Sequence, residues 1–416
     1  MSVSRLMLAA SLIALALPAA AQTPEETAAA ALDEAPVWDG HNDMPGQLRW
    51  RFNSMIGDFD FTHTLEGDHW TPGQMHTDIA RLREGKVGVQ WWSVYVSASL
   101  EEPVAVQTTI EQIDVLKRLI AENPDDMALA LTSADVERAL AEGKIAGMIG
   151  MEGGHSIGTS LAVLRQMYDL GARYMTLTHS ANTSWADSAT DDPEHDGLTD
   201  WGVKVVQEMA RLGMLIDLSH VSEATMMDTL DATDAPVIFS HSGARAVTDH
   251  ARNVPDAVLR RLPEHDGIVM VVALPGYISE PQRQRNANRA GEKARLESLN
   301  QGNPAAVEAG LAAWDQANPM PDATITDMAD HIDHIRDVIG VDYIGIGGDY
   351  DGMASGPVGM EDVTGYPALF VELARRGYSK EDLEKIASRN MMRVLKKAEA
   401  YAASQANVPP IETPVS

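Results

Sequence analysis

The sequence predicts an α/β protein whose eight parallel strands close into a (β/α)8 TIM-type barrel. Short apolar segments rich in Val, Ile and Met recur along the chain, and a segment with helical periodicity follows most of them. Strands of this kind, alternating with helices, are typical of a parallel sheet that is buried on both faces. Eight such units suit a barrel, and a doubly wound open sheet is the alternative.

The expected elements follow from these patterns. The strands are expected at Val37–His41, Val87–Val96, Ile145–Met151, Tyr174–Thr178, Met214–Leu218, Pro236–Ser240, Gly267–Val272 and Tyr343–Gly348. Helices are expected between most of them, for example at Thr108–Glu122, Ser160–Leu170, Gly202–Leu212, Ser222–Leu230 and Asp256–Leu262. Two more helices are expected after the last strand, at Tyr366–Arg376 and Lys380–Ala398.

A single catalytic domain is expected over residues 35–400. Two insertions depart from a minimal barrel: residues 42–86, rich in Gly, His and aromatic residues, and residues 280–322, which are polar with a helical stretch around residues 305–315. Residues 22–34 are expected to form a loose leader, and residues 401–416 a flexible tail.

Residues 1–21 have the features of an export signal. Arg5 gives the positive start, Leu6–Leu17 is an apolar run, and Ala19–Ala21 fits an A-x-A cleavage site. The run is too short to span a bilayer, and no later stretch reaches the roughly 20 apolar residues that a span needs. We therefore expect an exported protein, periplasmic or secreted, without a membrane span.

Composition restricts the partners and the chemistry. The formal net charge of −29 argues against nucleic acid or anionic lipid as a partner. The chain has no Cys, which excludes a thiolate nucleophile, Cys-ligated zinc and disulfides. Any homodimer must therefore be non-covalent.

Potential metal ligands follow several of the predicted strands. His41 and Asp43 come after the first strand, where alternate side chains of an extended chain share a face. In (β/α)8 barrels the chemistry sits at the carboxyl ends of the strands. Four of the 13 His residues fall at such ends. The further candidates at these ends are Glu152, His179, His220, His241 and Asp349.

This set of residues indicates a dinuclear metallohydrolase. Imidazoles and carboxylates without thiolates suit Zn²⁺, and also Mn²⁺, Co²⁺ or Fe²⁺. Five ligands exceed the needs of one open catalytic site, but suit two metals about 3.5–4 Å apart that share a carboxylate and activate a water. Glu152 is the natural bridge, because the two glycines after it allow close approach of the backbone.

Seven blocks of the sequence resemble the membrane (renal-type) dipeptidases, zinc enzymes of the amidohydrolase-like barrels. The similarity runs from about Val37 to Val394. The blocks are DGHND at 39–43, MEGGHS at 151–156, LTHSANTSWAD at 177–187, IDLSHVS at 216–222, VIFSHS at 237–242, RNVPD at 252–256 and GGDYDG at 347–352.

The resemblance implies a role for each ligand. His41 and Asp43 would hold one Zn²⁺, His220 and His241 would hold the other, and Glu152 would bridge them. The implied activity is hydrolysis of the peptide bond of dipeptides, and the family commonly tolerates a D-residue at the second position.

The resemblance also implies roles toward the substrate. His179 would polarise the scissile carbonyl or steady its oxyanion, and Arg252 would clamp the terminal carboxylate through its planar guanidinium. Tyr277, in PGYIS, would contact the substrate. Asp349 would carry a proton from the attacking water to the leaving amine.

Some neighbouring residues compete for these roles. Arg245 lies nearer to His241 in the sequence, and only the RNVP match favours Arg252. Asp351 competes with Asp349, which comes first after the strand. His155 is expected to support a ligand, the Trp91–Trp92 pair to pack in the barrel, and the histidines of the first insertion to lie in a solvated loop: His63, His69 and His76.

Two departures from the family bear on function. Its vertebrate members have a Trp directly after DGHNDxP, whereas Gly46 follows Pro45 here, which bears on side-chain selectivity. The chain also lacks the apolar C-terminal tail that signals a lipid anchor.

Two alternatives to a dipeptidase remain: an N-acyl-D-amino acid deacylase with the same metals, and a non-catalytic exported metal or solute receptor, which would have no need of Asp349.

Overall fold

The computed structural model describes residues 22–65, 71 and 73–413, so the predicted export signal lies outside the described residues. Within them, eight parallel strands close into a barrel, which confirms the predicted fold and excludes the open sheet. The order around the barrel is β1 (Val37–Asn42), β2 (Val87–Ser93), β4 (Ile145–Glu152), β5 (Ala172–Thr176), β6 (Leu215–Asp217), β7 (Val237–Ser242), β8 (Ile268–Val272) and β9 (Ile344–Gly347), which pairs with β1.

One strand was not predicted. The short β3 (Met127–Leu129) pairs in parallel with the first three residues of β4. The closed ring passes directly from β2 to β4, because these two strands pair along most of their length. β3 is therefore an addition to the barrel and is not one of the eight strands of the closed ring.

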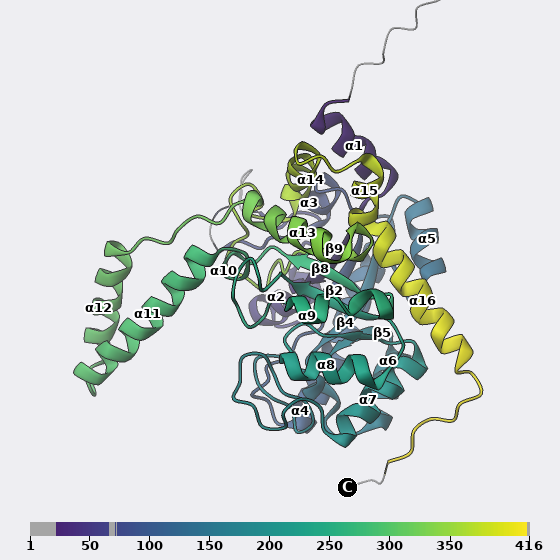
Figure 1. The fold of residues 1–416 in the computed structure, drawn as a ribbon, viewed down its shortest axis with the longest axis horizontal. Coiled ribbons are helices and arrows are strands. Elements are labelled where there is room, and N and C mark those ends of the chain that lie inside the picture. Colours follow the sequence, from purple (N-terminus) through teal and green to yellow (C-terminus); the bar gives the residue numbers. More distant parts are fainter. Residues whose placement is uncertain (1–21, 66–70, 72, 414–416) are drawn as a thin grey trace, which may run out of the picture.

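Helices surround the barrel (Figure 1). Several begin at a Ser or Thr whose side chain accepts a hydrogen bond from a backbone N–H of the first turn, as Ser160, Thr199 and Ser222 do. The connecting helices are α4 (Glu102–Glu122), α5 (Ser133–Ala141), α6 (Leu161–Leu170), α7 (Asp200–Leu212), α8 (Glu223–Ala232), α9 (Asp256–Leu259), α13 (Ile325–Ile339) and α14 (Tyr366–Arg375).

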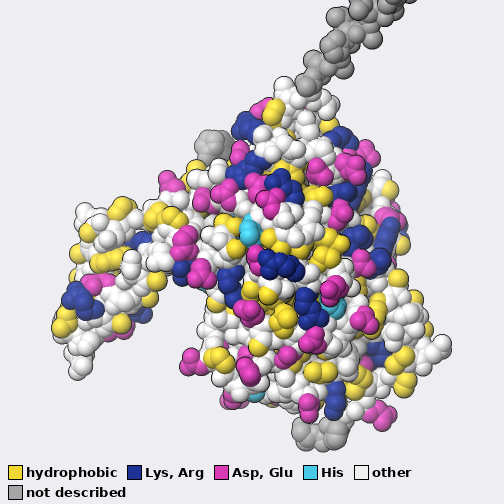
Figure 2. Space-filling model, in the orientation of Figure 1, with side chains coloured by type: hydrophobic (Ala, Val, Ile, Leu, Met, Phe, Trp, Pro, Cys, Tyr) yellow, Lys and Arg dark blue, Asp and Glu magenta, His cyan; other side chains and the backbone are white. Residues whose placement is uncertain are grey.

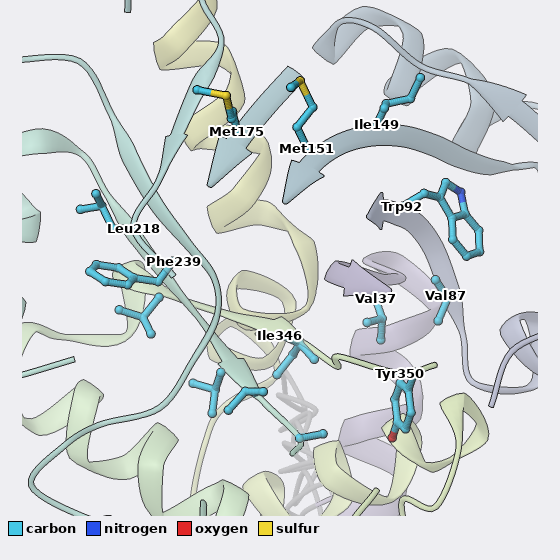
Figure 3. Close-up of a cluster of buried hydrophobic side chains, with 14 of the residues drawn as sticks. Val37, Val87, Trp92, Ile149, Met151, Met175, Leu218, Phe239, Ile346 and Tyr350 are labelled. Carbon is cyan, nitrogen blue, oxygen red and sulfur yellow. The ribbon is translucent and has the colours of Figure 1, made fainter. Parts of the chain in front are cut away.

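The core has two main clusters because successive strand residues point to opposite faces. Figure 3 shows part of the larger cluster, which includes Val37, Trp92 and Ile149. The neighbouring residues Trp38, Trp91 and Met148 belong to the other cluster. All of these side chains are buried, so the prediction that Trp91 and Trp92 pack in the barrel is confirmed.

Residues 22–34 and the stretch that follows residue 400 are more ordered than the sequence predicted. Residues 22–34 are not a loose leader: they contain α1 (Pro24–Glu34), which starts with a capping box between Thr23 and Glu26 and packs against α14 and α15 (Lys380–Glu384). The boundary at residue 400 was also wrong, since α16 (Asn390–Ser404) continues past it and Ile411 N donates to Glu208.

The insertion after β1 folds over the barrel. It contains α2 (Met44–Phe52) and α3 (Ile79–Glu84). The buried Arg81 joins it to the segment after β9, with its guanidinium 2.8 Å from Asp78 and 2.9 Å from Asp362. Charge-assisted hydrogen bonds of this kind hold the insertion in place.

The insertion after β8 forms a helical arm, defined here as α11 (Glu280–Leu299) and α12 (Pro304–Ala317). It follows the short α10 (Pro275–Ile278) and projects away from the barrel, with apolar and charged side chains intermixed on its surface (Figures 1 and 2). At its base, Gln282 donates to the carbonyl of Pro321. Among the described residues, no helix is long and apolar enough to cross a membrane.

Candidate metal centre and active site

The carboxyl ends of the strands bring the predicted ligands together at one end of the barrel. His41 lies in β1, Asp43 directly follows it, and Glu152 is the last residue of β4. His41 Nε2 lies 3.4 Å from Asp43 Oδ2 and 3.4 Å from Glu152 Oε2. These three side chains are almost fully buried, so they form one half of a compact polar cluster.

The other half is formed around the second oxygen of the same glutamate. Glu152 Oε1 lies 3.0 Å from His220 Nε2 and 3.6 Å from His241 Nε2. The two imidazole nitrogens are 3.0 Å apart. Glu152 therefore faces His41 with one oxygen and the His220–His241 pair with the other, the arrangement expected of a bridging carboxylate.

The residues fit divalent cations. Among the described residues, His41 Nε2 and Asp43 Oδ1 are buried without a hydrogen-bond partner, although such atoms are normally paired. Ligand atoms of His41, Asp43 and Asp349 lie within 4.8 Å of one another, as do those of His41, Glu152 and His241. Nitrogen and oxygen donors without sulfur suit zinc and related metals, and cations would offset the buried carboxylate charge.

Neighbouring hydroxyl groups orient the ligands. Tyr174 Oη lies 2.9 Å from His41 Nδ1, and Ser240 Oγ lies 2.8 Å from His241 Nδ1. Ser93 donates to Glu152 Oε2 at 3.0 Å. Contacts on the far side of a ligand fix its ring orientation and leave its other nitrogen free for a metal.

Two buried aspartates fix the strand ends that carry these ligands. Asp39 accepts hydrogen bonds from the backbone N–H of His41 and Gly348, and so joins β1 to the end of β9. Asp217 accepts them from Ser219 and Ser240, and so joins β6 to β7. The ligand positions are therefore set by bonds between neighbouring strands.

The backbone at the site adopts an uncommon conformation. His220, Asp349 and Asp351 have φ angles of 69°, 61° and 64°. This left-handed region is unfavourable for residues with a Cβ atom and occurs preferentially at functional sites.

Electrostatics hold His220, His241 and Glu152 in the forms that bind metals. Burial lowers the pKa of His220 and His241 well below the ordinary value, and the Arg252 charge adds to this effect, so both rings are neutral. Burial alone would raise the pKa of Glu152, but His41 and a hydrogen bond from His220 outweigh it and hold that pKa well below its usual range. A neutral imidazole and an ionised carboxylate are the forms that bind metals. The pKa of His41 is instead raised well above its usual value, because neighbouring acidic groups outweigh the lowering by burial.

His179 lies at the edge of the ligand cluster. Its Nε2 is 3.7 Å from Glu152 Oε1, and its side chain is 19% exposed, more than those of the buried ligands. Its Nδ1 is 3.1 Å from Ser180 Oγ. Tyr95, which the sequence reasoning did not select, packs on His179 with ring centroids 4.7 Å apart.

The structure separates the two competing arginines. Arg245 is bound at the surface, with its guanidinium 2.8 Å from Glu223. Arg252 is 1% exposed, and its guanidinium lies 3.2 Å from the carbonyl oxygen of His241 and 5.3 Å from the centre of the Tyr277 ring. The sequence match that favoured Arg252 over the nearer Arg245 thus selected the arginine beside the metal centre.

The two competing aspartates are also separated. Asp349 lies with His41 and Asp43, and burial raises the pKa of its carboxyl to about 8, with the neighbouring carboxylates adding to the effect. Asp351 instead accepts a hydrogen bond from the backbone N–H of His76. His76 is buried, so the prediction that it lies in a solvated loop was wrong, whereas His63 is exposed and His69 lies outside the described residues.

Comparisons with known proteins agree with this geometry. The profile of the family described as membrane dipeptidase (peptidase family M19) matches residues 25–408. Dipeptidase 3 of Rattus norvegicus is 40% identical over 392 residues, which cover 93% of this chain and 70% of that protein. Dipeptidase 3 of Mus musculus is 39% identical over 392 residues, covering 93% and 69%.

Solved structures share the fold. The probable dipeptidase PvdM from Pseudomonas aeruginosa superposes with a TM-score of 0.77 at 21% identity, covering 91% of this chain and 99% of that one. Dipeptidase AC, a family M19 metallopeptidase, gives 0.71 at 26% identity, covering 88% and 98%. A Rhodobacter sphaeroides metallopeptidase, liganded with a phosphinate mimic of the dipeptide L-Ala-D-Ala, gives 0.70 at 25% identity, covering 88% and 99%.

Three observations point to the same family. The family profile spans nearly the whole described chain, relatives are near 40% identical, and a buried His/Glu cluster lies at the barrel mouth. They confirm the resemblance that the sequence motifs indicated. This chain belongs to the membrane dipeptidase family, the M19 metallopeptidases, which hydrolyse peptide bonds.

Proposed function

We propose that this protein is a dinuclear zinc dipeptidase. The observation that supports it most directly is the position of Glu152, whose two carboxylate oxygens face separate sets of histidines at 3.0–3.6 Å. His41 and Asp43 would hold one Zn²⁺ and His220 and His241 the other, with Glu152 between them; other divalent metals are possible occupants. When bound, the ions would polarise the scissile carbonyl and lower the pKa of a water molecule.

The other residues of the site supply binding and proton transfer. Arg252 binds the terminal carboxylate of the substrate through its guanidinium, which fits a carboxylate in a planar, bidentate manner. Tyr277 packs beside Arg252 and borders the same site. His179 donates from Nε2 to the oxygen of the scissile carbonyl as charge develops there, with Ser180 bound at its Nδ1.

Asp349 moves the proton. Its carboxylate takes a proton from the attacking water and delivers it to the leaving amine as the C–N bond breaks. Asp349 lies beside Asp43 and His41, within reach of the same reaction centre.

The arrangement of the binding groups and the relatives support the substrate class. A free carboxylate held by Arg252 and a carbonyl held at the ligand cluster leave room for a short peptide. The ligand of the Rhodobacter sphaeroides relative mimics L-Ala-D-Ala, which supports tolerance of a D-residue at the carboxyl-terminal position. Residues 1–21 support export to a periplasm or the medium.

One experiment tests the proposal. The purified protein is analysed for metals and assayed against L,L- and L,D-dipeptides and N-acyl-D-amino acids, alongside the variant Glu152→Gln. We expect two zinc ions per chain and hydrolysis of dipeptides in the native protein, and loss of both in the variant. Cleavage of the acylated amino acids alone would identify a deacylase, metal binding without hydrolysis would identify a receptor, and two retained metals in Glu152→Gln would exclude the bridge.

A further inference from the structure

A cavity beside Tyr95 is not used by the ligands or by the carboxylate site. Its volume is about 370 Å³, and it lies between the end of α2, the segment after β2 and the start of α4. Its walls are largely apolar, with Trp50, Tyr95, Val96, Leu100 and Val104 among the lining residues.

Aromatic rings connect this cavity to the metal centre. The centroid of the Tyr95 ring lies 4.7 Å from that of His179 and 6.1 Å from that of Trp50, the latter pair edge to face at 72°. His179 in turn lies 3.7 Å from Glu152. A substrate group that extends past His179 therefore meets the faces of Tyr95 and Trp50.

The wall after β2 is held by polar side chains from other elements. Gln112 of α4 donates to the carbonyl of Tyr95, and His155 Nε2 lies 3.0 Å from the carbonyl oxygen of Val96. These bonds fix the backbone that carries the Tyr95 ring. The wall is thus formed before a ligand arrives, as is usual for small-molecule sites.

Gly46 determines where the Trp50 ring lies. A Cβ atom at position 46 would come within 3.0–3.4 Å of three carbons of that ring, so the indole occupies the space that a side chain at 46 would take. The two residues are one helical turn apart on α2. Trp50 nevertheless remains 54% exposed, which leaves ring surface for a ligand to cover.

The charge that borders the cavity is compensated. Arg49 lies on its wall, but its guanidinium is 3.0 Å from the Glu111 carboxylate. An apolar group can therefore enter without leaving a charge unpaired, whereas a carboxylate would compete with Glu111. Aromatic walls of this kind favour large aliphatic or aromatic side chains.

The barrel topology indicates which end of the substrate reaches the cavity. The ring runs β2, β4, β5, β6, β7, so β2 and β7 stand four places apart among eight strands and face each other across the mouth. Tyr95 follows β2, and Arg252 follows β7. With the carboxylate at Arg252 and the scissile carbonyl between them, the amino-terminal residue lies on the Tyr95 side.

We propose that this cavity is the subsite for a large apolar side chain on the amino-terminal residue of the dipeptide, and that Trp50 determines this specificity. The inference rests on the proposed dipeptidase function and names its preferred substrates: dipeptides that begin with an aromatic or branched aliphatic residue. The Trp50 ring packs on Tyr95 and over Gly46, so Trp50 acts on substrate choice rather than on the reaction.

The test compares kcat/KM for Phe-Ala, Ala-Phe and Ala-Ala in the native protein and in three variants. Native protein should prefer Phe-Ala over Ala-Ala. Trp50→Ala should lower that preference about tenfold, mainly through KM, and Trp50→Phe should lower it only two- to threefold, at the scale of single apolar contacts. Met55→Ala, which removes another exposed apolar side chain near the end of α2, should leave the preference unchanged. Turnover of Ala-Ala should be the same in all four proteins.

Each other outcome has a distinct meaning. An unchanged preference in Trp50→Ala, or an equal loss on Ala-Ala, overturns the subsite while leaving the dipeptidase function standing. A loss confined to Ala-Phe places Trp50 against the carboxyl-terminal residue and also overturns it. If native, metal-loaded protein cleaves none of the three dipeptides, the proposed function fails and the subsite fails with it.

Discussion

Asp349 differs from Asp351 in position, since both are buried with a raised pKa and a left-handed backbone, but only Asp349 lies beside His41 and Asp43. Replacing it with Asn keeps the shape of the side chain but removes the ability to take a proton. We expect Asp349→Asn to retain the metals and to lose about 10²- to 10⁴-fold in kcat, the usual contribution of a positioned acid–base group. Steady-state kinetics with metal analysis of the same sample checks this; near-native kcat would exclude the role.

Arg245 is a control for Arg252, because it lies in the same loop but is bound to Glu223 at the surface. Arg252→Met should raise KM for substrates with a free carboxylate about 10- to 100-fold, because a charge-assisted hydrogen bond contributes about 1.5–3 kcal/mol. Arg245→Met should leave KM within about twofold. Kinetics on a dipeptide and on its carboxyl amide tests the assignment, since the amide should show little response to Arg252→Met. Equal KM changes in both arginine variants would contradict it.

At the residue scale, the ligands were predictable and the substrate cavity was not. His41, Glu152 and His241 lie at the ends of apolar strands and His220 lies just after one, so position in the sequence revealed them. Trp50 gave no such signal, because its position depends on the missing side chain of Gly46. His76 was misread because its buried partner Asp351 lies 275 positions away in the sequence.

At the scale of elements, His331 joins α13 to the segments that follow the neighbouring strands β7 and β8. Its Nδ1 accepts a hydrogen bond from the backbone N–H of Ala244 at 2.8 Å, and its Nε2 lies 3.2 Å from the carbonyl oxygen of Ile278. Ala244 follows β7, and Ile278 ends α10 next to Tyr277. Burial lowers the pKa of His331 to about 4.

This contact predicts loss of stability in acid. The unfolded chain protonates His331 near pH 6.5, but the folded chain does so only near pH 4. Stability from the neutral ring is therefore complete above pH 6.5 and is lost as the pH falls toward 4, by up to about 3 kcal/mol. His331→Gln should be less stable at pH 7 and should lose less between pH 7 and 4.5.

Chemical denaturation at several pH values measures this difference in the free energy of unfolding. The exposed His63 provides the control, since His63→Gln should follow the native pH dependence. Parallel loss of stability with falling pH in native protein and His331→Gln would contradict the assignment.

Of the helical arm, the sequence predicted a helix in the region of α12 but not α11. Along α11 only Gln282 and Leu296 are buried, so its sequence carries no apolar stripe from which a helix could be predicted. The helix is supported instead by ion pairs three residues apart, such as Glu280 with Arg283 and Glu292 with Arg295. The short β3 was missed likewise, because three residues are too few to show alternation.

For the whole molecule, the metals should stabilise the fold as well as the reaction. Asp43, Glu152 and Asp349 are buried together, and bound cations would relieve their mutual repulsion. Chelation should abolish activity and lower Tm by about 4 °C, since ions bound at 100- to 1000-fold over Kd contribute about 3–4 kcal/mol and a chain of this length has an unfolding entropy of about 0.9 kcal/mol/K. Readdition of zinc should restore both. An unchanged Tm in protein shown to be free of metal would contradict this prediction.

In the closed ring, every strand that carries a ligand is bonded to a neighbouring strand on both edges. Substitutions in these strands and substitutions in the connecting segments therefore have different consequences during evolution. Substitutions in the strand ends disturb the neighbouring strands on either side, so the residues that carry out the reaction are expected to change slowly. Trp50, Arg252 and Tyr277 lie on connecting segments, which tolerate replacement more readily. Proteins that descend from this barrel can therefore change their substrate preference while keeping the same metal ligands and catalytic residues.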